Sequence, residues 1–167
     1  MRLSQLKKKM DSVQIKNILS RDSVTKHYFL DVFASDELPA GVVRYPACFV
    51  CNLDESTKPG SHWLGFYLTT SDRVEFFDSY GNRPDYFKGP ISNFVSRFSQ
   101  VTFNPVTLQS NVSAVCGQYC IYYLYSRCRG KTLENIVSQF VTKNICNDQL
   151  VYNFVAKKFH VYANFYQ

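Results

Sequence analysis

The chain has 167 residues, of which 46% are hydrophobic and 16% aromatic. This length fits one domain large enough to bury a core, and this composition excludes an intrinsically disordered chain. A net charge of +6 favours acidic partners such as nucleic acid, but the basic residues are dispersed along the sequence, which favours a solvated surface instead. We therefore expect one domain that spans residues 1–167.

The N-terminal segment carries positive charge without the apolar run of a secretory signal. Lys7, Lys8 and Lys9 are not followed by such a run, and no apolar stretch of the chain is long enough to cross a bilayer. We expect a soluble intracellular protein, a monomer that is neither secreted nor bound to a membrane.

Six cysteines in a chain without a secretory signal indicate reduced thiols rather than disulfides. Cys48 and Cys51 have the Cys-x-x-Cys spacing, but no second such pair completes a zinc site. They lie in an apolar run with strand character, so burial as small hydrophobic side chains is the better interpretation. The sequence therefore predicts no metal site.

Helical periodicity opens the chain. The first apolar set at helical spacing is Leu3, Leu6, Met10 and Val13. A second set either continues this helix or starts another that is capped by Asp11 or Ser12, and it comprises Ile15, Ile18 and Leu19. Residues 1–12 are therefore predicted to be a flexible or helical extension of the domain.

Strand signals follow in the next third of the sequence. Residues 42–43 and 47–51 are typical of strands, and the second of these is apolar enough to be buried on both faces. A polar loop at 52–60 leads into a strand at 62–68. A short turn then connects this strand to another at 73–78, which predicts an antiparallel hairpin.

The rest of the sequence combines one more strand region with helices. Residues 101–104 and 106–108 are typical of a strand interrupted by Pro105. Helices are predicted around Phe94, Val95 and Phe98, from Ser113 to Gly130, and over 133–140 and 148–159. These elements predict an α+β fold in which helices pack on a small central sheet, mixed or antiparallel.

Four residues of different chemistry stand in an order that suits a thiol nucleophile. His62 opens the strand at 62–68, Asp78 ends the strand at 73–78, and Gln109 lies seven positions before Cys116. An ordinary thiol keeps its proton until pH about 8.5. Cys116 lies at a predicted helix start, where free N–H groups and an imidazolium partner favour the thiolate.

The other residues of this set complete a catalytic arrangement. Hairpin pairing brings the Asp78 carboxylate to His62, where it fixes the imidazole tautomer. Gln109 and the backbone N–H of Cys116 would then stabilise a tetrahedral oxyanion. Gly117 would let a substrate approach the backbone closely. The sequence thus predicts a cysteine peptidase that needs no cofactor for its chemistry.

Ordinary structural roles explain the other candidates better. His27 and His160 are expected on the surface, and Cys120 and Cys128 in the core. Asp72 and Glu75 are weaker substitutes for Asp78 as the orienting acid. Asp54 and Glu55 are expected to be solvated acids of a loop.

At these motifs the chain resembles the adenovirus-type cysteine proteases, the adenain family, with relatives encoded by large DNA transposons and related viruses. More distantly it resembles the SUMO-specific proteases. The matching stretches are Gly60-Ser61-His62-Trp63, Phe77-Asp78-Ser79-Tyr80-Gly81, the Gln109-to-Cys116 spacing, and Asn111, Ser113, Ala114 and Gly117. The resemblance implies a single-domain papain-like fold, with weak similarity reaching back to residue 13.

Roles for individual residues follow from this resemblance. It implies Cys116 as nucleophile, His62 as base, Asp78 as orienting acid and Gln109 as oxyanion donor. Trp63 would line a narrow substrate cleft, although a core position for this ring is equally expected. The family prefers small residues before the scissile bond. The expected substrates are therefore viral or transposon structural precursors cleaved after Gly-containing motifs, in a host nucleus or a virion.

Two departures from the family pattern limit what carries over. The adenoviral enzymes usually have Glu where this chain has Asp78. They are also activated by a peptide tethered through a cysteine shortly before the glutamine, and no cysteine lies between Asp78 and Gln109. The sequence therefore argues against a disulfide-linked peptide activator, and activation by DNA is a family expectation with weak support from the charge.

Two other functions are compatible with the sequence. A deconjugase that cleaves after the Gly-Gly tail of a ubiquitin-like modifier would use the same four groups, but the Gln-to-Cys spacing and the Asn-x-Ser-Ala-x-Cys loop favour the adenoviral type. A non-catalytic basic module that binds nucleic acid is the weaker alternative, since the chain has no such motif and its charge is not gathered in a stripe.

Overall fold

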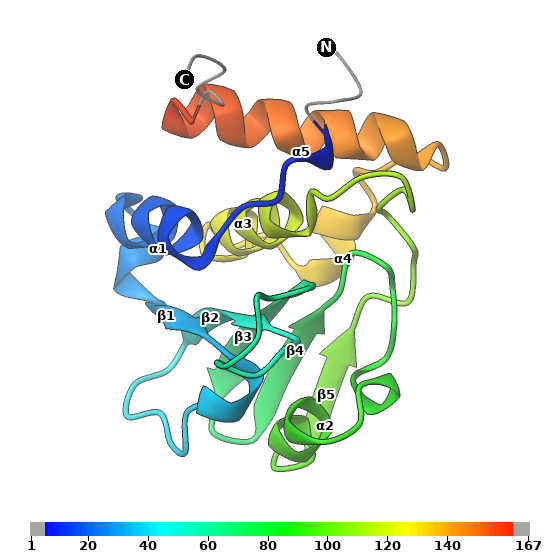
Figure 1. The fold of residues 1–167 in the computed structure, drawn as a ribbon. Coiled ribbons are helices and arrows are strands. Elements are labelled where there is room, and N and C mark those ends of the chain that lie inside the picture. The colour runs from blue at the N-terminus through cyan, green and yellow to red at the C-terminus, as the bar shows by residue number, and fades with distance from the viewer. Residues whose placement is uncertain (1–5, 162–167) are drawn as a thin grey trace.

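The computed structural model describes residues 6–161 (Figure 1). A five-stranded sheet in the order β1-β2-β3-β4-β5 forms its centre. The inner pairs β2–β3 and β3–β4 are antiparallel, whereas the outer pairs β1–β2 and β4–β5 are parallel, so the sheet is mixed. The strands are Phe29–Phe33, Ala47–Asn52, Trp63–Thr70, Arg73–Phe77 and Gln100–Phe103.

Within residues 6–161, five α-helices surround this sheet. They are α1 Ser12–Arg21, α2 Pro90–Val95, α3 Cys116–Arg127, α4 Leu133–Val137 and α5 Asn144–Phe159. Figure 1 shows α3 between the sheet and α5, with α1 beside α3, whereas α2 lies near β5 away from α5. Helices therefore cover both faces of the sheet, and the α+β fold predicted from the sequence is confirmed.

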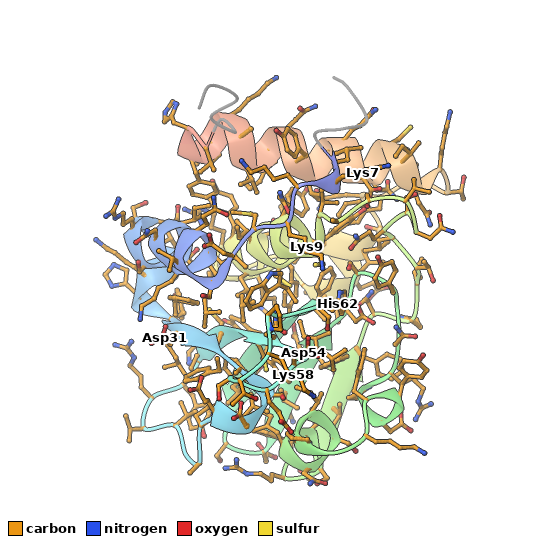
Figure 2. All side chains as sticks on the ribbon, in the orientation of Figure 1. Lys7, Lys9, Asp31, Asp54, Lys58 and His62 are labelled. Atoms are coloured by element: carbon orange, nitrogen blue, oxygen red, sulfur yellow. The ribbon has the colours of Figure 1, made fainter. Side chains whose placement is uncertain are left out.

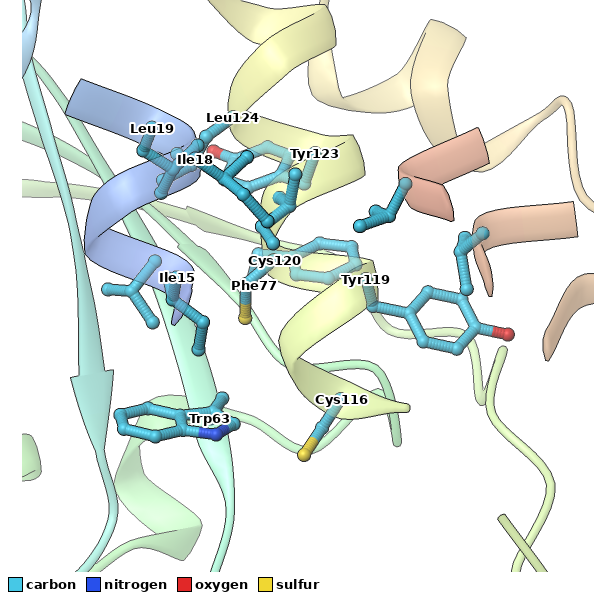
Figure 3. Packing of buried hydrophobic residues seen from close by; sticks show 14 of the residues in the cluster. Ile15, Ile18, Leu19, Trp63, Phe77, Cys116, Tyr119, Cys120, Tyr123 and Leu124 are labelled. Carbon is cyan, nitrogen blue, oxygen red and sulfur yellow. The ribbon is translucent and has the colours of Figure 1, made fainter. Parts of the chain in front are cut away.

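The side chains of β2 and β3 alternate between two cores, which is why both strands are almost wholly apolar. Cys48 and Val50 point into the core shared with α1, α3 and α5. Phe49 and Cys51 point into the second core, beneath α2. Every residue of β2 is buried, as expected for a strand covered on both faces. Figure 3 shows the first core, in which α3 packs against β3 and α1.

Of the two N-terminal arrangements predicted, the structure has the second, a separate helix capped by Asp11. Met10 and Leu6 are buried but lie outside any α-helix, and α1 starts only at Ser12. The Asp11 Oδ1 accepts a hydrogen bond from the Gln14 N–H at 2.8 Å, and the Gln14 Oε1 accepts one from the Asp11 N–H at 3.1 Å. This capping box fixes the helix start, as one alternative predicted. Val13 is exposed, and Leu3 lies outside the described residues.

Three strand predictions were wrong or incomplete. Residues 42–43 and 106–108 are not strands. β1 was missed because the sequence Phe29–Phe33 carries an aspartate and lacks a clear alternation. Its parallel pairing with β2 orders it, with Val32 opposite Val50 and Phe33 opposite Cys51. Among residues 6–161, no helix has the length and apolar character that spanning a membrane requires.

Candidate active site

The β3–β4 hairpin brings His62 and Asp78 together. His62 precedes β3 and Asp78 follows β4, so the antiparallel register places both at the same end of the hairpin. The His62 Nε2 lies 2.6 Å from the Asp78 Oδ1. Both residues are buried, with 9% of His62 and 0% of Asp78 exposed. The predicted pairing of this acid with this imidazole is present in the structure.

The Asp78 carboxylate is surrounded by donors besides His62. The Tyr80 N–H donates to Oδ1 at 3.1 Å, and Asn82 donates to Oδ2 through its backbone at 3.2 Å and its side chain at 2.7 Å. Burial raises the pKa of Asp78, but the hydrogen bond and charge of His62 and these donors lower it below its usual value overall. The acid is therefore held ionised in a buried position.

Asn104 fixes the backbone on which this acid sits. Its Oδ1 accepts from the Asp78 N–H at 3.1 Å, and its Nδ2 donates to the Asp78 carbonyl at 2.8 Å. The next turn fits tightly against the same loop, since a Cβ on Gly81, at φ +73°, would lie 2.6 Å from the Val106 carbonyl carbon. Sequence reasoning missed Asn104 and Asn82, because a single Asn in a loop carries no signal of its own.

Cys116 is the first residue of α3. The helix therefore begins three residues later than the predicted start at Ser113. The preceding residue, Val115, offers no side-chain cap, so the first N–H groups of α3 are left for other acceptors. Burial lowers the pKa of His62, but hydrogen bonds and charge from Asp78 and Cys116 outweigh it and raise the pKa to about 9. Cys116 and Asp78 thus both act on this imidazole.

The Gln109 side chain is held at both ends. Its Oε1 accepts from the Ser79 hydroxyl at 2.7 Å, and its Nε2 lies 3.2 Å from both the carbonyl oxygen and the hydroxyl of Ser113. Only 1% of Gln109 is exposed. The amide nitrogen therefore faces into the loop that ends at Cys116.

Helix α5 supports this loop from the other side. The buried Asp148 accepts from the Tyr119 hydroxyl at 2.9 Å, and its oxygens lie 3.3 Å from the Ser110 N–H. Asn147 donates to the Leu108 carbonyl at 3.2 Å. Burial raises the pKa of Asp148 and outweighs the hydrogen bonds that lower it. These contacts connect α3, α5 and the Gln109 loop, and no pattern in the sequence indicates them.

A cleft of about 470 Å³ opens beside Cys116. Trp63 and the loop at Gly60 and Ser61 line it close to the thiol. Figure 3 shows Cys116 at the end of α3, with Trp63 on the side toward which its sulfur extends. The outer part of the cleft carries charged residues, among them Lys9, Asp54 and Lys58, on the side of the molecule where Figure 2 shows His62.

Trp63 and Gly117 were both predicted to contact substrate, and they differ in whether they line the cleft. Trp63 meets both expectations, because it lines the cleft and also packs in the core, with its Nε1–H donating to the Met10 carbonyl at 2.9 Å. Gly117 is buried and does not line the cleft. A Cβ there would lie 3.2 Å from Met10 and Ile15 atoms and 3.3 Å from Trp63, so tight packing at the start of α3 favours glycine here. Close approach of a substrate to its backbone stays a prediction.

The residues set aside at the outset lie largely where expected. His27 and His160 are exposed, and Cys48, Cys51, Cys120 and Cys128 are buried free thiols. Asp72 bonds to Thr70 at 2.6 Å and Glu75 pairs with Arg127 at 2.8 Å, so neither replaces Asp78. Asp54 and Glu55 belong to the expected loop, but they also line the cleft.

Comparison with known proteins places this geometry in context. No family model matches the chain. The chain is 26% identical over 125 residues to cysteine protease S273R of African swine fever virus (isolate Tick/Malawi/Lil 20-1/1983), a match that covers 67% of this chain and 43% of that protein. The chain is thus homologous to S273R at low identity and spans less than half the length of this relative.

Solved structures share the fold. The crystal structure of the African swine fever virus pS273R protease superposes with a TM-score of 0.57 and 19% identity, over 87% of this chain and 66% of that one. The central domain of the Legionella pneumophila protein Lpg1148 gives a TM-score of 0.55 at 13% identity, over 92% and 98%. The fold is therefore one also found in a viral cysteine protease.

Proposed function

We propose that this chain is a cysteine peptidase in which Cys116, His62 and Asp78 form the catalytic triad. The observation that carries the proposal is the 2.6 Å contact between His62 Nε2 and a buried Asp78 with three further hydrogen bonds. This contact occupies one ring nitrogen and leaves Nδ1 for the sulfur of Cys116. The homology to a protein named cysteine protease S273R supports the same activity.

The raised pKa of His62 sets the protonation state from which the reaction starts. With a pKa of about 9, the imidazole is protonated at neutral pH and carries the positive charge that would stabilise a thiolate on Cys116. The thiolate attacks the carbonyl carbon of the scissile bond, and the imidazolium donates its proton to the departing amine. The neutral imidazole then takes a proton from water, which attacks the thioester, releases the acid and restores the thiolate.

Gln109 is proposed to stabilise the tetrahedral oxyanion together with the backbone N–H of Cys116. One amide N–H of Gln109 can serve both Ser113 oxygens as a three-centre bond, which leaves the other for substrate. Backbone N–H groups at the start of α3 add positive potential at the same place. Removing one such donor from a protease typically costs about 10²-fold or more in rate.

The proposed substrates are proteins, and in particular structural precursors of a virus or transposon cleaved after Gly-containing motifs. The viral origin of S273R and the resemblance of the Gln109–Cys116 segment to the adenoviral loop support this choice. The cleft beside Cys116 and Trp63 offers room for an extended peptide. Activation by DNA stays a prediction.

A deconjugase for a ubiquitin-like modifier is the second candidate. The resemblance of the four catalytic groups to those of SUMO-specific proteases favours it. A modifier carrying a C-terminal vinyl sulfone would label Cys116 rapidly if this candidate is right. Hydrolysis of Gly-containing peptides without such labelling would support the endopeptidase.

The test uses the exposed Cys146 as a matched control for the buried nucleophile. Candidate precursor proteins are incubated with wild-type protein, Cys116→Ala and Cys146→Ala, and the new N-termini of the products are sequenced. Wild type and Cys146→Ala should give the same products, and Cys116→Ala none. Cleavage by Cys116→Ala at the wild-type rate would refute the assignment of the nucleophile.

A further inference from the structure

Ser79 makes a buried contact with the side chain of Gln109 that none of the triad chemistry uses. Its hydroxyl donates to the Gln109 Oε1 at 2.7 Å, an ordinary length for an O–H···O hydrogen bond. Both residues are only 1% exposed, so water does not compete for either atom. Ser79 directly follows Asp78 in the sequence.

The backbone of Ser79 also holds the segment that carries Gln109. Its carbonyl accepts from the Leu108 N–H at 2.9 Å and from the Gln109 N–H at 3.0 Å. The end of the β3–β4 hairpin is therefore joined to the Gln109 loop by three hydrogen bonds from one residue. Asp78 and Ser79 together link the hairpin to the imidazole on one side and to the amide on the other.

The orientation of a glutamine amide decides whether it stabilises or repels an oxyanion. Its nitrogen donates and its oxygen only accepts, and the two ends have nearly the same shape. A rotation by half a turn would direct the Gln109 oxygen where the nitrogen now lies, and this oxygen would repel a developing negative charge. In the rotated form this oxygen would also face the Ser113 carbonyl, which only accepts, and the hydrogen bond that Ser79 now donates to it would be lost.

We propose that Ser79 is a positioning residue for catalysis, which holds the amide oxygen of Gln109 so that the amide nitrogen is presented to the oxyanion. This inference rests on the proposed function, because it needs Gln109 as the oxyanion donor. It assigns the Asp78-Ser79 pair two tasks, since one residue orients the base and the next orients the electrophilic amide.

The first experiment compares Ser79→Ala with Ser126→Ala, which removes another buried serine hydroxyl from α3 outside the site. Both are made in the Cys146→Ala background. Ser79→Ala should lower kcat for peptide hydrolysis by about tenfold with an unchanged KM, because only transition-state binding is lost. Ser126→Ala should match the parent in both constants.

A second readout separates the amide from the nucleophile. Alkylation of Cys116 by iodoacetamide displaces iodide and forms no oxyanion, so it reports the reactivity of the Cys116–His62 pair alone. Ser79→Ala should be alkylated at the parent rate. A proportional loss of alkylation and hydrolysis would mean that Ser79 acts on the triad or on the fold, and would overturn the proposal.

A double-mutant cycle gives the decisive result. In a Gln109→Ala background, Ser79→Ala should change kcat by less than about twofold, because the group that it positions is absent. An equal tenfold loss in both backgrounds would overturn the proposal. If Ser79→Ala does not fold, Ser79→Cys replaces it, since a thiol is a weak donor of similar shape, and a parental kcat for this variant would also overturn the proposal.

These outcomes are distinguishable from failure of the proposed function. If the parent protein has no hydrolysis that depends on Cys116, the peptidase assignment itself fails. If hydrolysis depends on Cys116 and Gln109 but not on Ser79, only the positioning role fails.

Discussion

The two cores on either side of the sheet differ in chemistry. Beneath α2 the core is dominated by phenylalanine, with Phe49 and Phe66 stacked at 4.7 Å and Phe94 edge-on to both at 5.6 Å. The core beneath α3 is also apolar, but it includes Trp63 and Cys116 and borders the buried polar groups around Asp78. Substitutions in the first core should therefore cost stability, whereas substitutions at the edge of the second should cost activity.

Cys116→Ala should have the largest effect on activity. Loss of the sulfur removes the nucleophile, so we expect no measurable peptide hydrolysis. The free energy of unfolding should change little, since alanine fills the same apolar position. Hydrolysis and urea denaturation of the same preparation measure both. A large loss of stability would contradict the expectation that substitutions at the edge of the core beneath α3 mainly cost activity.

Asp78→Asn should impair hydrolysis by up to about 10⁴-fold without abolishing it. The amide cannot stabilise an imidazolium, and it can present an N–H to Nε2 of His62, which favours the wrong tautomer. Alkylation of Cys116 should slow as well, unlike the result expected for Ser79→Ala. Unchanged kinetics would show that another group orients His62.

Phe66→Ala tests the other core. Its ring is fully buried and contacts Phe49, Phe76 and Phe94, so we expect a loss of about 3–5 kcal/mol in the free energy of unfolding. The folded fraction should retain its kcat, determined after titration of active sites. A kcat that falls in the folded fraction would show that the two cores are coupled.

Gln109→Ala should lower kcat by about 10²-fold and leave KM nearly unchanged. The group acts on the transition state only, because the ground-state carbonyl carries little negative charge. Steady-state kinetics on a Gly-containing peptide provide the measurement. An increase in KM alone would assign Gln109 to substrate binding.

The last prediction concerns the pH dependence of stability. Because the pKa of His62 is raised from 6.5 to about 9 on folding, its contribution to stability is complete below pH 6.5 and is lost as the pH rises toward 9. The free energy of unfolding of wild type should fall relative to His62→Ala across this window. A constant difference between the two proteins would contradict the raised pKa.

Much of the fold was predictable where local signals were strong. The buried strand around Phe49, the β3–β4 hairpin and the capping box at Asp11 all follow from short-range patterns. β1 was not predictable in this way, because its extended conformation depends on pairing with β2 rather than on a pattern in its own residues. The tight packing around Gly117 was not predictable for a similar reason, since its neighbours Met10 and Ile15 come from a distant segment.

The sequence by itself determined which chemical groups are present, their order along the chain and the hairpin that joins His62 to Asp78. Only the tertiary structure decided how these groups are supported, through Asn104, Ser79 and Asp148. The physical reason is that a hydrogen bond between distant segments leaves no period or spacing in a sequence. Such contacts exist only once the cores on both faces of the sheet have packed and excluded water.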